Sequence, residues 1–480
     1  MFSLETMRTA KEWIIVEIET GRCMIPMPHD LAIVKSWNDK VLNDFADQAL
    51  DWNFSRPVLL DVPKGNQAFR KGHYIPPQDR LILCAAMVHH YDHIHNYVTS
   101  DENQVNYDRP LPINAEENFI RVDYHDHYMA FKNRLIADEE DNKWILHTDI
   151  KNFAGSCCTD KTLESLNELG FEETTLSIFY NAFNIWKADA VTGIPQGYAL
   201  TDILLKVYMV SIDDMMTQRF GNEVSYYRYC DDIQIAGQKD QVQAAGKYLQ
   251  SCLNEKGLIL KEQGSILAEP GVRAIGHAYQ PHKILEQLVP LGKKQELIPS
   301  DYEFDRDNPH ACLVLSCYEH FVSPRKINDE MPNKYLFSYV LRHMRKQKLI
   351  KFVPDVPDLI DMYPNRLEKL LRSALAVGMP GQHLAILVPK FFTDEGRNNP
   401  KKDHDRLVFL NILKENFYPV EPISVQFLNG ALDSIVTRNP LFKPHKQELQ
   451  KMSDAYKIST PKSGRQSECF YPTAHRPMMH

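Results

Sequence analysis

The run VSYYRYCDDIQIAG, from Val224 to Gly237, decides the fold of this chain. Apolar and polar residues alternate on both sides of Tyr229-Cys230-Asp231-Asp232, a pattern typical of two β-strands joined by a tight turn. Such a turn would carry the two acids out of the sheet. Taken alone, a pair of adjacent acids usually lies on a solvated turn and has no chemical role.

Two segments upstream change this interpretation. WILHTDIKNF places Asp149 at the end of an apolar strand, and GIPQG, from Gly193 to Gly197, lies between the two acidic sites. If the two strands are neighbours in one sheet, Asp149 lies beside Asp231 and Asp232. Carboxylate oxygens are the ligands that Mg²⁺ prefers, so the sequence predicts a site for divalent cations. On its own, Asp149 could equally be a helix N-cap or a turn acid.

Composition sets the broad class of the protein. The 480 residues suffice for about three domains at roughly 150 residues each. An apolar fraction of 43% and a charged fraction of 25% are those of a globular protein, which argues against wholesale disorder. The net charge of −8 argues against a simple basic coat for nucleic acid, although a polymerase can confine its cations to one channel.

Cysteine usage and hydropathy bear on location. The nine cysteines form no CxxC pair, and Cys157 and Cys158 are adjacent, which suits a reduced chain. The N-terminus mixes acids into its apolar residues, and no segment has the uncharged length that spans a bilayer. We therefore expect a cytoplasmic protein without a membrane partner.

The chain divides into three blocks by pattern. Residues 1–143 mix helical stretches, such as an amphipathic segment from Pro77 to Tyr91, with polar loops. Residues 144–280 alternate strand, helix and hairpin, with helices beginning near Thr159, after Gly197 and at Gln241. This order predicts an antiparallel sheet backed by helices. Residues 281–480 are mostly helical in pattern. We expect an α+β fold followed by a mainly α-helical C-terminal domain.

Five motifs in this order resemble the successive motifs of reverse transcriptases. They are TDIKNF, GIPQG with Thr201 four residues after its last glycine, YCDD, GLIL and AIGHAY. Upstream, PKGNQAFRKGHYIPPQDR resembles the fingers segment of the same family, so the likeness covers about Lys64 to Tyr279. The bacterial branch is the closer match, in particular the abortive-infection or defence-associated (unknown-group) enzymes, which are related to those of retrons and group II introns.

The resemblance implies a fold and a function. The fold would be a right-hand polymerase, with fingers and the N-terminal part of the palm in 1–143, the palm in 144–280 and a helical thumb or extension in 281–480. The activity would be RNA-templated DNA synthesis from dNTPs with two Mg²⁺ ions, for which Mn²⁺ is an alternative. The biological setting would be antiviral (anti-phage) defence with a non-coding RNA as template and DNA as product. A homo-oligomer is left open.

The same resemblance assigns roles to individual residues. Asp149 and Asp231 would bind the metal ions together with the carbonyl of Ile150, and Asp232 would complete the catalytic triad. The nucleotide pocket would be formed by Lys64, Arg70, Phe153, Ala154, Gln196 and Gly197. Of these, Lys64 and Arg70 would contact the triphosphate, where fixed positive charge offsets the charge of the transferring phosphates.

Three positions depart from the family pattern. Ala154 stands where the family usually has the Phe or Tyr that blocks a ribose 2′-hydroxyl, and Phe153 comes just before it. Either Phe153 takes over this role or discrimination against ribonucleotides is relaxed. Gly264 replaces the family's downstream Lys, a candidate proton donor to pyrophosphate, and Lys261 is close but not equivalent. Asp202 follows Thr201 where Pro is common.

Three other interpretations of the same residues stay open. The palm could belong to an RNA polymerase, which the Ala154 position allows, or to a template-independent or protein-primed nucleotidyl transferase. A catalytically idle RNA-binding scaffold would have no reason to gather three acids that face phosphate. The C-terminal helices could grip the duplex, form an oligomer contact, or both.

Histidines suggest a separate hypothesis. HHYDHIH, from His89 to His95, and DYHDH, from Asp123 to His127, contain metal-ligand residue types. His89 and His93 would share one face of a helix, as zinc ligands do. The usual second matched pair is not visible, so a polar helix followed by a loop is the competing interpretation.

Overall fold

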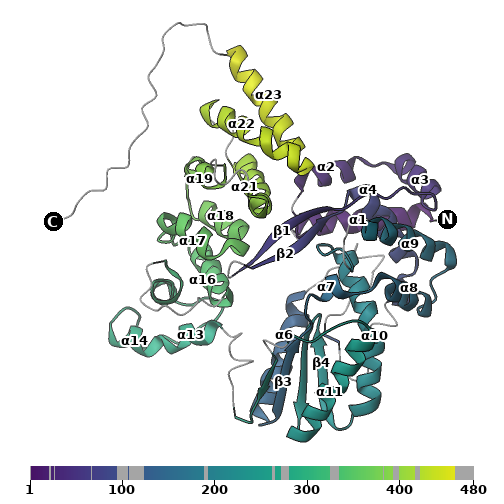
Figure 1. Cartoon of the computed structure of the whole chain (residues 1–480). Coiled ribbons are helices and arrows are strands. Elements are labelled where there is room, and N and C mark those ends of the chain that lie inside the picture. Colours follow the sequence, from purple (N-terminus) through teal and green to yellow (C-terminus); the bar gives the residue numbers. More distant parts are fainter. Residues whose placement is uncertain are drawn as a thin grey trace.

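The computed structural model describes most of the chain (Figure 1). The described residues are 2–20, 23–25, 27–65, 68–94, 106–107, 124–188, 193–261, 265–271, 281–324, 334–381, 383–392, 399–416 and 422–459.

The N-terminal part combines helices with a two-stranded antiparallel hairpin. Its elements are α1 (Leu4–Glu19), α2 (Pro28–Ser36), α3 (Asp39–Gln48), β1 (Val58–Gly65), β2 (Ala68–Tyr74) and α4 (Pro77–His89). Helix α1 begins after Ser3, whose hydroxyl accepts a hydrogen bond from the Thr6 N–H at 3.0 Å. It packs against α2, α3 and α4, so it forms the centre of this part.

Helix α4 differs from its expected amphipathic character. Almost every residue from Pro77 to Met87 is buried, including the charged Asp79 and Arg80. The Asp79 carboxylate accepts hydrogen bonds from the Trp52 indole N–H and the Ser55 backbone N–H, both at 2.8 Å. Because its charges are satisfied inside the protein, this helix lies in the core and not at the surface.

The middle part contains a four-stranded antiparallel sheet with strand order β4-β5-β3-β6. Its elements are α6 (Tyr124–Glu140), β3 (Trp144–Asp149), α7 (Phe153–Ser156), α8 (Thr159–Glu168), α9 (Glu173–Ala188), α10 (Ala199–Phe220), β4 (Val224–Tyr229), β5 (Asp232–Gly237), α11 (Lys239–Glu255) and β6 (Ile266–Ala268). Helices α6, α10 and α11 pack against the sheet. The predicted hairpin is confirmed over the whole run from Val224 to Gly237, and the predicted helix at Gln241 begins two residues earlier.

The described residues after position 280 form helices. They are α13 (Pro281–Gln287), α14 (Val289–Lys294), α15 (Ala311–Cys317), η1 (Tyr318–Val322), α16 (Lys334–Lys346), η2 (Val353–Asp355), α17 (Val356–Met362), η3 (Pro364–Arg366), α18 (Leu367–Ala376), α19 (His383–Phe392), η4 (Pro400–Lys402), α21 (Asp403–Asn416), α22 (Pro422–Arg438), η5 (Pro440–Phe442) and α23 (Lys443–Ser459). The expected α+β fold with an antiparallel sheet and a mainly helical C-terminal region is confirmed.

The molecule has two large hydrophobic cores, and the second combines C-terminal helices with residues from the N-terminal part of the chain. One core joins the N-terminal helices to the sheet and its helices. The other belongs to the C-terminal helices but includes Leu60 and Val62 of β1. Figure 1 shows the β1–β2 hairpin lying between the N-terminal helices and the C-terminal ones, and β1 contacts η3, η4 and α21. The C-terminal helices therefore support the hairpin directly.

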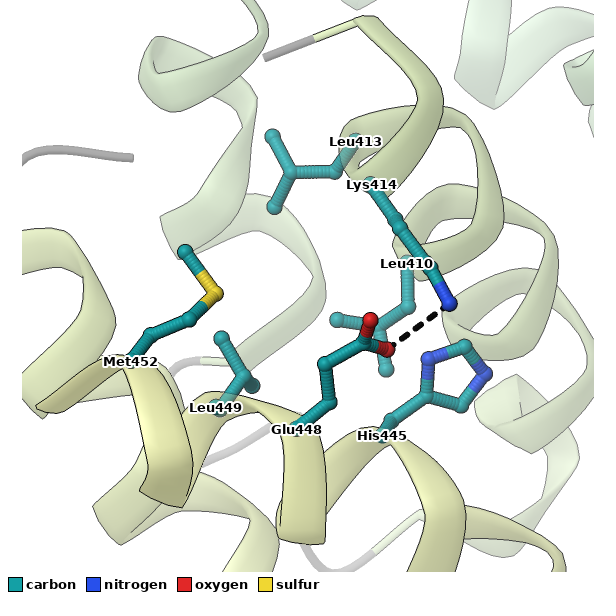
Figure 2. A pocket seen from close by; sticks show the side chains of 7 residues that line it. All are labelled: Leu410, Leu413, Lys414, His445, Glu448, Leu449 and Met452. Carbon is teal, nitrogen blue, oxygen red and sulfur yellow. Dashed lines mark ion pairs between the residues drawn. The ribbon is translucent and has the colours of Figure 1, made fainter. Parts of the chain in front are cut away.

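A small apolar pocket lies between α21 and α23. Figure 2 shows Leu410 and Leu413 of α21 near Leu449 and Met452 of α23, with the ion pair between Lys414 and Glu448, 2.9 Å long, at one side. Its volume is about 30 Å³, which is far too small for a nucleotide. The pocket is therefore a packing feature of the two helices.

Within the described ranges, no helix combines the length and the apolar character that crossing a membrane requires.

Candidate active site

Asp149 and Asp232 face each other across two central strands of the sheet. Strand β3 ends at Asp149, strand β5 begins at Asp232, and the two residues are partners in the antiparallel register. Asp231 lies one residue earlier in the turn, and its carbonyl accepts a hydrogen bond from the Ile150 N–H at 3.4 Å. The sheet thus gathers the three acids that the sequence predicts to act together.

Buried side chains stabilise the turn that contains Asp231. Cys230 has a φ of 55°, a left-handed conformation that costs a non-glycine residue about 1 to 2 kcal/mol. The fully buried Arg228 donates to the Cys230 carbonyl at 3.3 Å and to the carboxylate of Asp213 on α10 at 2.7 Å. Tyr226 also donates to Asp213, at 2.9 Å. Through Asp213 and Arg228, helix α10 therefore fixes the position of the β4–β5 turn relative to the sheet.

Charge is crowded at the three acids. Burial raises the pKa of Asp231 to about 6, and the neighbouring carboxylates of Asp149 and Asp232 add to the shift. The Lys261 ammonium donates to Oδ2 of Asp149, and the Lys261 N–H donates to the Asp149 carbonyl at 2.8 Å. The other carboxylate oxygen of Asp149, Oδ1, is buried and accepts no hydrogen bond from the described residues.

This arrangement fits hard divalent cations. Three carboxylates offer oxygen ligands, which suit Mg²⁺ or Mn²⁺, and neither imidazole nor sulfur comes from the triad. A buried oxygen without a donor, such as Oδ1 of Asp149, costs free energy unless a cation or a hydrogen bond satisfies it. Bound cations would also relieve the repulsion among the carboxylates, which adds to the effect of burial on the pKa of Asp231.

A cavity of about 780 Å³ opens beside the acids. It is large enough for a nucleoside triphosphate. The predicted site residues that line it are Lys64, Arg70, Ile150, Phe153, Ala154, Gln196, Gly197 and Asp231. Asp149 and Asp232 adjoin this lining through Lys261 and Asp231, respectively. The structure therefore brings all ten predicted residues into one region, drawn from the β1–β2 hairpin, the sheet and its β4–β5 turn, helix α7 and the loop before α10.

Positively charged side chains line the same cavity as Asp231. Lys64 and Arg70 lie on β1 and β2, and both side chains are exposed to the cavity. Burial lowers the pKa of Lys64, and the nearby Lys261 and Arg70 lower it further, while Asp149 and Asp231 oppose this effect. The charge of Lys64 therefore interacts both with the other cations and with Asp149 and Asp231.

The loop that contains Gln196 and Gly197 is clamped on both sides. The Gln196 N–H donates to Nδ1 of His73 at 3.2 Å, and the His73 N–H donates to the Gln196 carbonyl at 3.1 Å. The Met24 N–H donates to the Gly197 carbonyl at 3.0 Å. Gly193 has a φ of 72°, and a Cβ there would lie 2.1 Å from the Ala154 carbonyl oxygen, so only glycine fits.

A buried ionic network supports this loop from the core. Arg80 of α4 lies 2.6 Å from Glu17 of α1, and its guanidinium stacks 4.3 Å from the ring centroid of Tyr198. Glu17 accepts a hydrogen bond from the Ala199 N–H, and the Tyr198 hydroxyl accepts one from the Ile75 N–H at 3.0 Å. The first turn of α10 is thus tied to α1, α4 and the end of β2.

Phe153 and Ala154 both line the cavity, and both are nearly buried, at 5% and 4% exposure. Asn152, just before them, has a φ of 48°, so the chain makes a sharp turn between β3 and α7. The backbone of Ala154 is fixed because its carbonyl accepts a hydrogen bond from the Ile194 N–H at 2.8 Å. Asp202, the third departure from the family pattern, also lines the cavity.

The sequence does not predict two residues of this site, Lys261 and His73. Lys261 lines the cavity and pairs with Asp149, although the motif pattern points to position 264. His73 holds the Gln196 loop through two hydrogen bonds, which no local motif indicates. Gly264 lies outside the described residues. The available signal for Lys261 was its place three residues before position 264, where the family usually has a Lys.

The histidine segments turn out differently from expectation. Helix α4 ends at His89 and the chain turns at His90, so the expected single helix with His89 and His93 on one face is wrong. His89 and His90 instead lie near Glu172, directly before α9. His95 and Asp123 lie outside the described residues.

Residues 62–279 match the protein family described as reverse transcriptase (RNA-dependent DNA polymerase). No curated protein matches the chain. Similar solved structures include apo telomerase from Candida tropicalis, at 11% identity and a TM-score of 0.34 over 86% of this chain and 74% of that one. Telomerase from Candida albicans in complex with a fragment of telomeric RNA has 10% identity and a TM-score of 0.30 over 88% and 69%.

Proposed function

We propose that the reverse transcriptase domain at residues 62–279, which is an RNA-directed DNA polymerase and hence a nucleotidyltransferase, uses a two-metal site formed by Asp149, Asp231 and Asp232. The observation that carries this proposal is the pairing of Asp149 with Asp232 beside a cavity that is lined by Asp231 and by the cations Lys64 and Arg70. Three acids beside a cavity that also contains fixed positive charge are the arrangement that a triphosphate and its counterions require.

The metal ions would be Mg²⁺, or Mn²⁺ as the alternative. Asp149 and Asp231 would bind them, with the Ile150 carbonyl and Asp232 as further oxygen ligands. When bound, such ions lower the pKa of the attacking 3′-hydroxyl and neutralise charge on the triphosphate. The site suits these ions because Oδ1 of Asp149 is buried without a hydrogen bond from the described residues, and because all three acids offer hard oxygen ligands.

The cations that line the cavity would position the triphosphate. Lys64 and Arg70 reach into the cavity from adjacent strands of the hairpin, so both can contact phosphate oxygens at once. Lys261 lies closest to the acids and can hold a proton on Nζ for the leaving pyrophosphate. Gln196 and Gly197 would border the base and ribose, because their loop is clamped against β2.

The finer biological setting rests on the motif resemblance of the sequence. We propose a role in anti-phage defence, with a non-coding RNA as template and a cytoplasmic location. The C-terminal helices would grip the template–product duplex, since they pack directly against the β1–β2 hairpin. Sequencing of nucleic acid that co-purifies with the protein would identify template, primer and product together.

Primer extension tests the catalytic part of this proposal. On an RNA template with dNTPs and Mg²⁺, Asp231→Asn should lower product formation roughly 1,000-fold, because it removes a metal ligand. The matched control is Asp240→Asn, an exposed acid on α11 that should leave synthesis unchanged. Wild-type protein that binds template–primer without extending it would favour an RNA-binding scaffold. Extension that persists in Asp231→Asn would reject the two-metal assignment.

A second candidate function follows from the small residue at position 154. Ala154 lines the cavity where a bulky ring would exclude a ribose 2′-hydroxyl, so RNA synthesis on the same site is the alternative. Parallel reactions with rNTPs and dNTPs separate the two activities, and omission of template tests for terminal transfer. A product joined covalently to the protein would indicate protein priming.

A further inference from the structure

A cluster of metal-ligand side chains lies outside the catalytic cavity. His89 at the end of α4, His90 in the following turn and Glu172 just before α9 each offer a ligand atom, and these atoms lie within 4.8 Å of one another. None of the three lines the cavity beside the catalytic acids. The cluster therefore lies between the end of α4 and the start of α9, outside the lining of that cavity.

His90 is held in a fixed orientation. Its ring is buried, stacks on Phe171 with 4.2 Å between ring centroids, and makes a 3.1 Å hydrogen bond from Nε2 to the Thr175 hydroxyl. When Nε2 carries the proton, Nδ1 keeps its lone pair, as a metal-bound histidine requires. A hydrogen bond to the second ring nitrogen is the usual way in which proteins orient such ligands.

The other members of the cluster can adjust. His89 and Glu172 are exposed, and the His89 ring contacts both Phe2 and His90, at 5.8 and 4.8 Å between centroids. The His93 ring lies 5.8 Å from that of His90 and could supply a fourth ligand. Tetrahedral zinc places its ligand atoms about 3.4 Å apart, so the ligand atoms would have to move closer, and His89 and Glu172 are the exposed side chains that can rotate.

We propose that His89, His90 and Glu172 bind a zinc ion that clamps the end of α4 to the start of α9, with water or His93 completing the coordination. Two imidazoles and one carboxylate are a common zinc ligand set. The ion would fasten the last turn of α4 to the residue that directly precedes α9. Helix α4 also carries Arg80, so the clamp would stabilise the core beneath the Gln196 loop.

The protonation state of His90 agrees with this role. Burial lowers the pKa of His90 to about 4, and the neighbouring His89 lowers it further, while Glu172 opposes the shift. The imidazole is therefore neutral at neutral pH, as a metal ligand must be.

Metal analysis of the full chain tests the proposal. Protein freed of metal with a chelator is incubated with zinc in an excess of Mg²⁺, which occupies the catalytic carboxylates and is a poor competitor for imidazole. After desalting, elemental analysis should give one zinc per chain, and the melting temperature should rise by several degrees. With cobalt in place of zinc, visible absorption bands should report nitrogen and oxygen ligands.

Variants identify the site. The double variant His89→Ala/Glu172→Gln changes two exposed side chains, so it should fold like wild type but retain no zinc and show no melting shift. The control is His320→Ala, another exposed histidine, which should retain one zinc. Wild type that retains no zinc, or a double variant that retains as much as wild type, would overturn the proposal. Catalytic activity is not the readout, so the result is independent of the two-metal assignment.

Discussion

Arg228 of β4 binds Asp213 of α10 inside the protein, with Nε 2.9 Å from each carboxylate oxygen and Nη2 2.7 Å from one of them. Arg228 also donates to the carbonyl of Cys230, in the turn that presents Asp231. The position of Asp231 thus depends on a buried ion pair that itself lies outside the cavity. This relationship links the stability of the sheet to the geometry of the site.

Removing one partner of this pair should destabilise the protein strongly. Asp213→Ala leaves the fully buried Arg228 without its counter-charge, which typically costs about 3 to 5 kcal/mol of unfolding free energy. Replacing both partners, as in Asp213→Leu/Arg228→Met, should cost clearly less, because no uncompensated charge is left. Urea unfolding followed by intrinsic fluorescence measures both values.

The exposed ion pair between Lys187 and Asp160 provides the control. Lys187→Ala should leave the urea midpoint nearly unchanged, because solvent screens this pair. If Asp213→Ala were no more destabilising than Lys187→Ala, the buried pair would not be what holds the turn.

Lys261 should compete with divalent cations for Asp149. Its ammonium donates to Oδ2 of Asp149, an oxygen that a metal ion would also use. Lys261→Met should therefore lower the Mg²⁺ concentration at half-maximal rate by a few-fold, while lowering the maximal rate about tenfold or more if Nζ gives a proton to pyrophosphate. Steady-state primer extension over a Mg²⁺ titration separates the two effects.

Lys247→Met, at an exposed lysine on α11, is the matched control and should change neither value. An unchanged Mg²⁺ requirement in Lys261→Met would contradict competition for Asp149. An unchanged maximal rate would leave Lys261 without a role in proton transfer.

Much of the site could be predicted because its residues lie at strand ends and turns. Alternation around Tyr229-Cys230-Asp231-Asp232 predicts the hairpin, and the apolar run before Asp149 predicts a further strand. Whether the two strands are neighbours is left open by these patterns, and the structure supplies the β3–β5 register that pairs Asp149 with Asp232. The ends of the single strands depend on local backbone periodicity, which a single sequence records well.

The remainder depends on long-range packing. Charged Asp79 and Arg80 make α4 look amphipathic, yet their partners Trp52 and Glu17 lie on other elements, and only the tertiary structure brings them together. The same holds for His73, whose partner Gln196 is more than a hundred residues away. No local pattern specifies such contacts, so the sequence underestimates how many residues support the loop.

Acid should destabilise the protein through His73. Burial lowers its pKa to about 4, and nearby Lys71 adds to the shift, so the folded state keeps the ring neutral and its Nδ1 accepts from Gln196. The unfolded chain binds a proton near pH 6.5. Stability contributed by the neutral ring is therefore complete above pH 6.5 and is lost as pH falls toward 4. Between pH 7.5 and 5.5 the loss should be about 1 kcal/mol.

His73→Asn tests this, since its side-chain oxygen can accept from the Gln196 N–H but does not titrate in this range. The variant should show a shallower loss of stability in urea unfolding between pH 7.5 and 5.5. His320→Gln, at an exposed histidine, should keep the wild-type slope. Equal slopes for His73→Asn and wild type would show that this ring does not carry the effect.

The side chain at position 154 should set the choice between ribonucleotides and deoxyribonucleotides. Ala154 lines a cavity of about 780 Å³, so a ring introduced there has room to extend toward the ribose. Wild type should incorporate rNTPs with measurable efficiency, and Ala154→Phe should lower the rNTP-to-dNTP ratio of kcat/KM on the order of 10- to 100-fold. Phe153→Leu distinguishes the two neighbours, because Phe153 also lines the cavity. If Phe153 is the gate, wild type excludes rNTPs strongly and Phe153→Leu admits them, which would contradict a relaxed gate at Ala154.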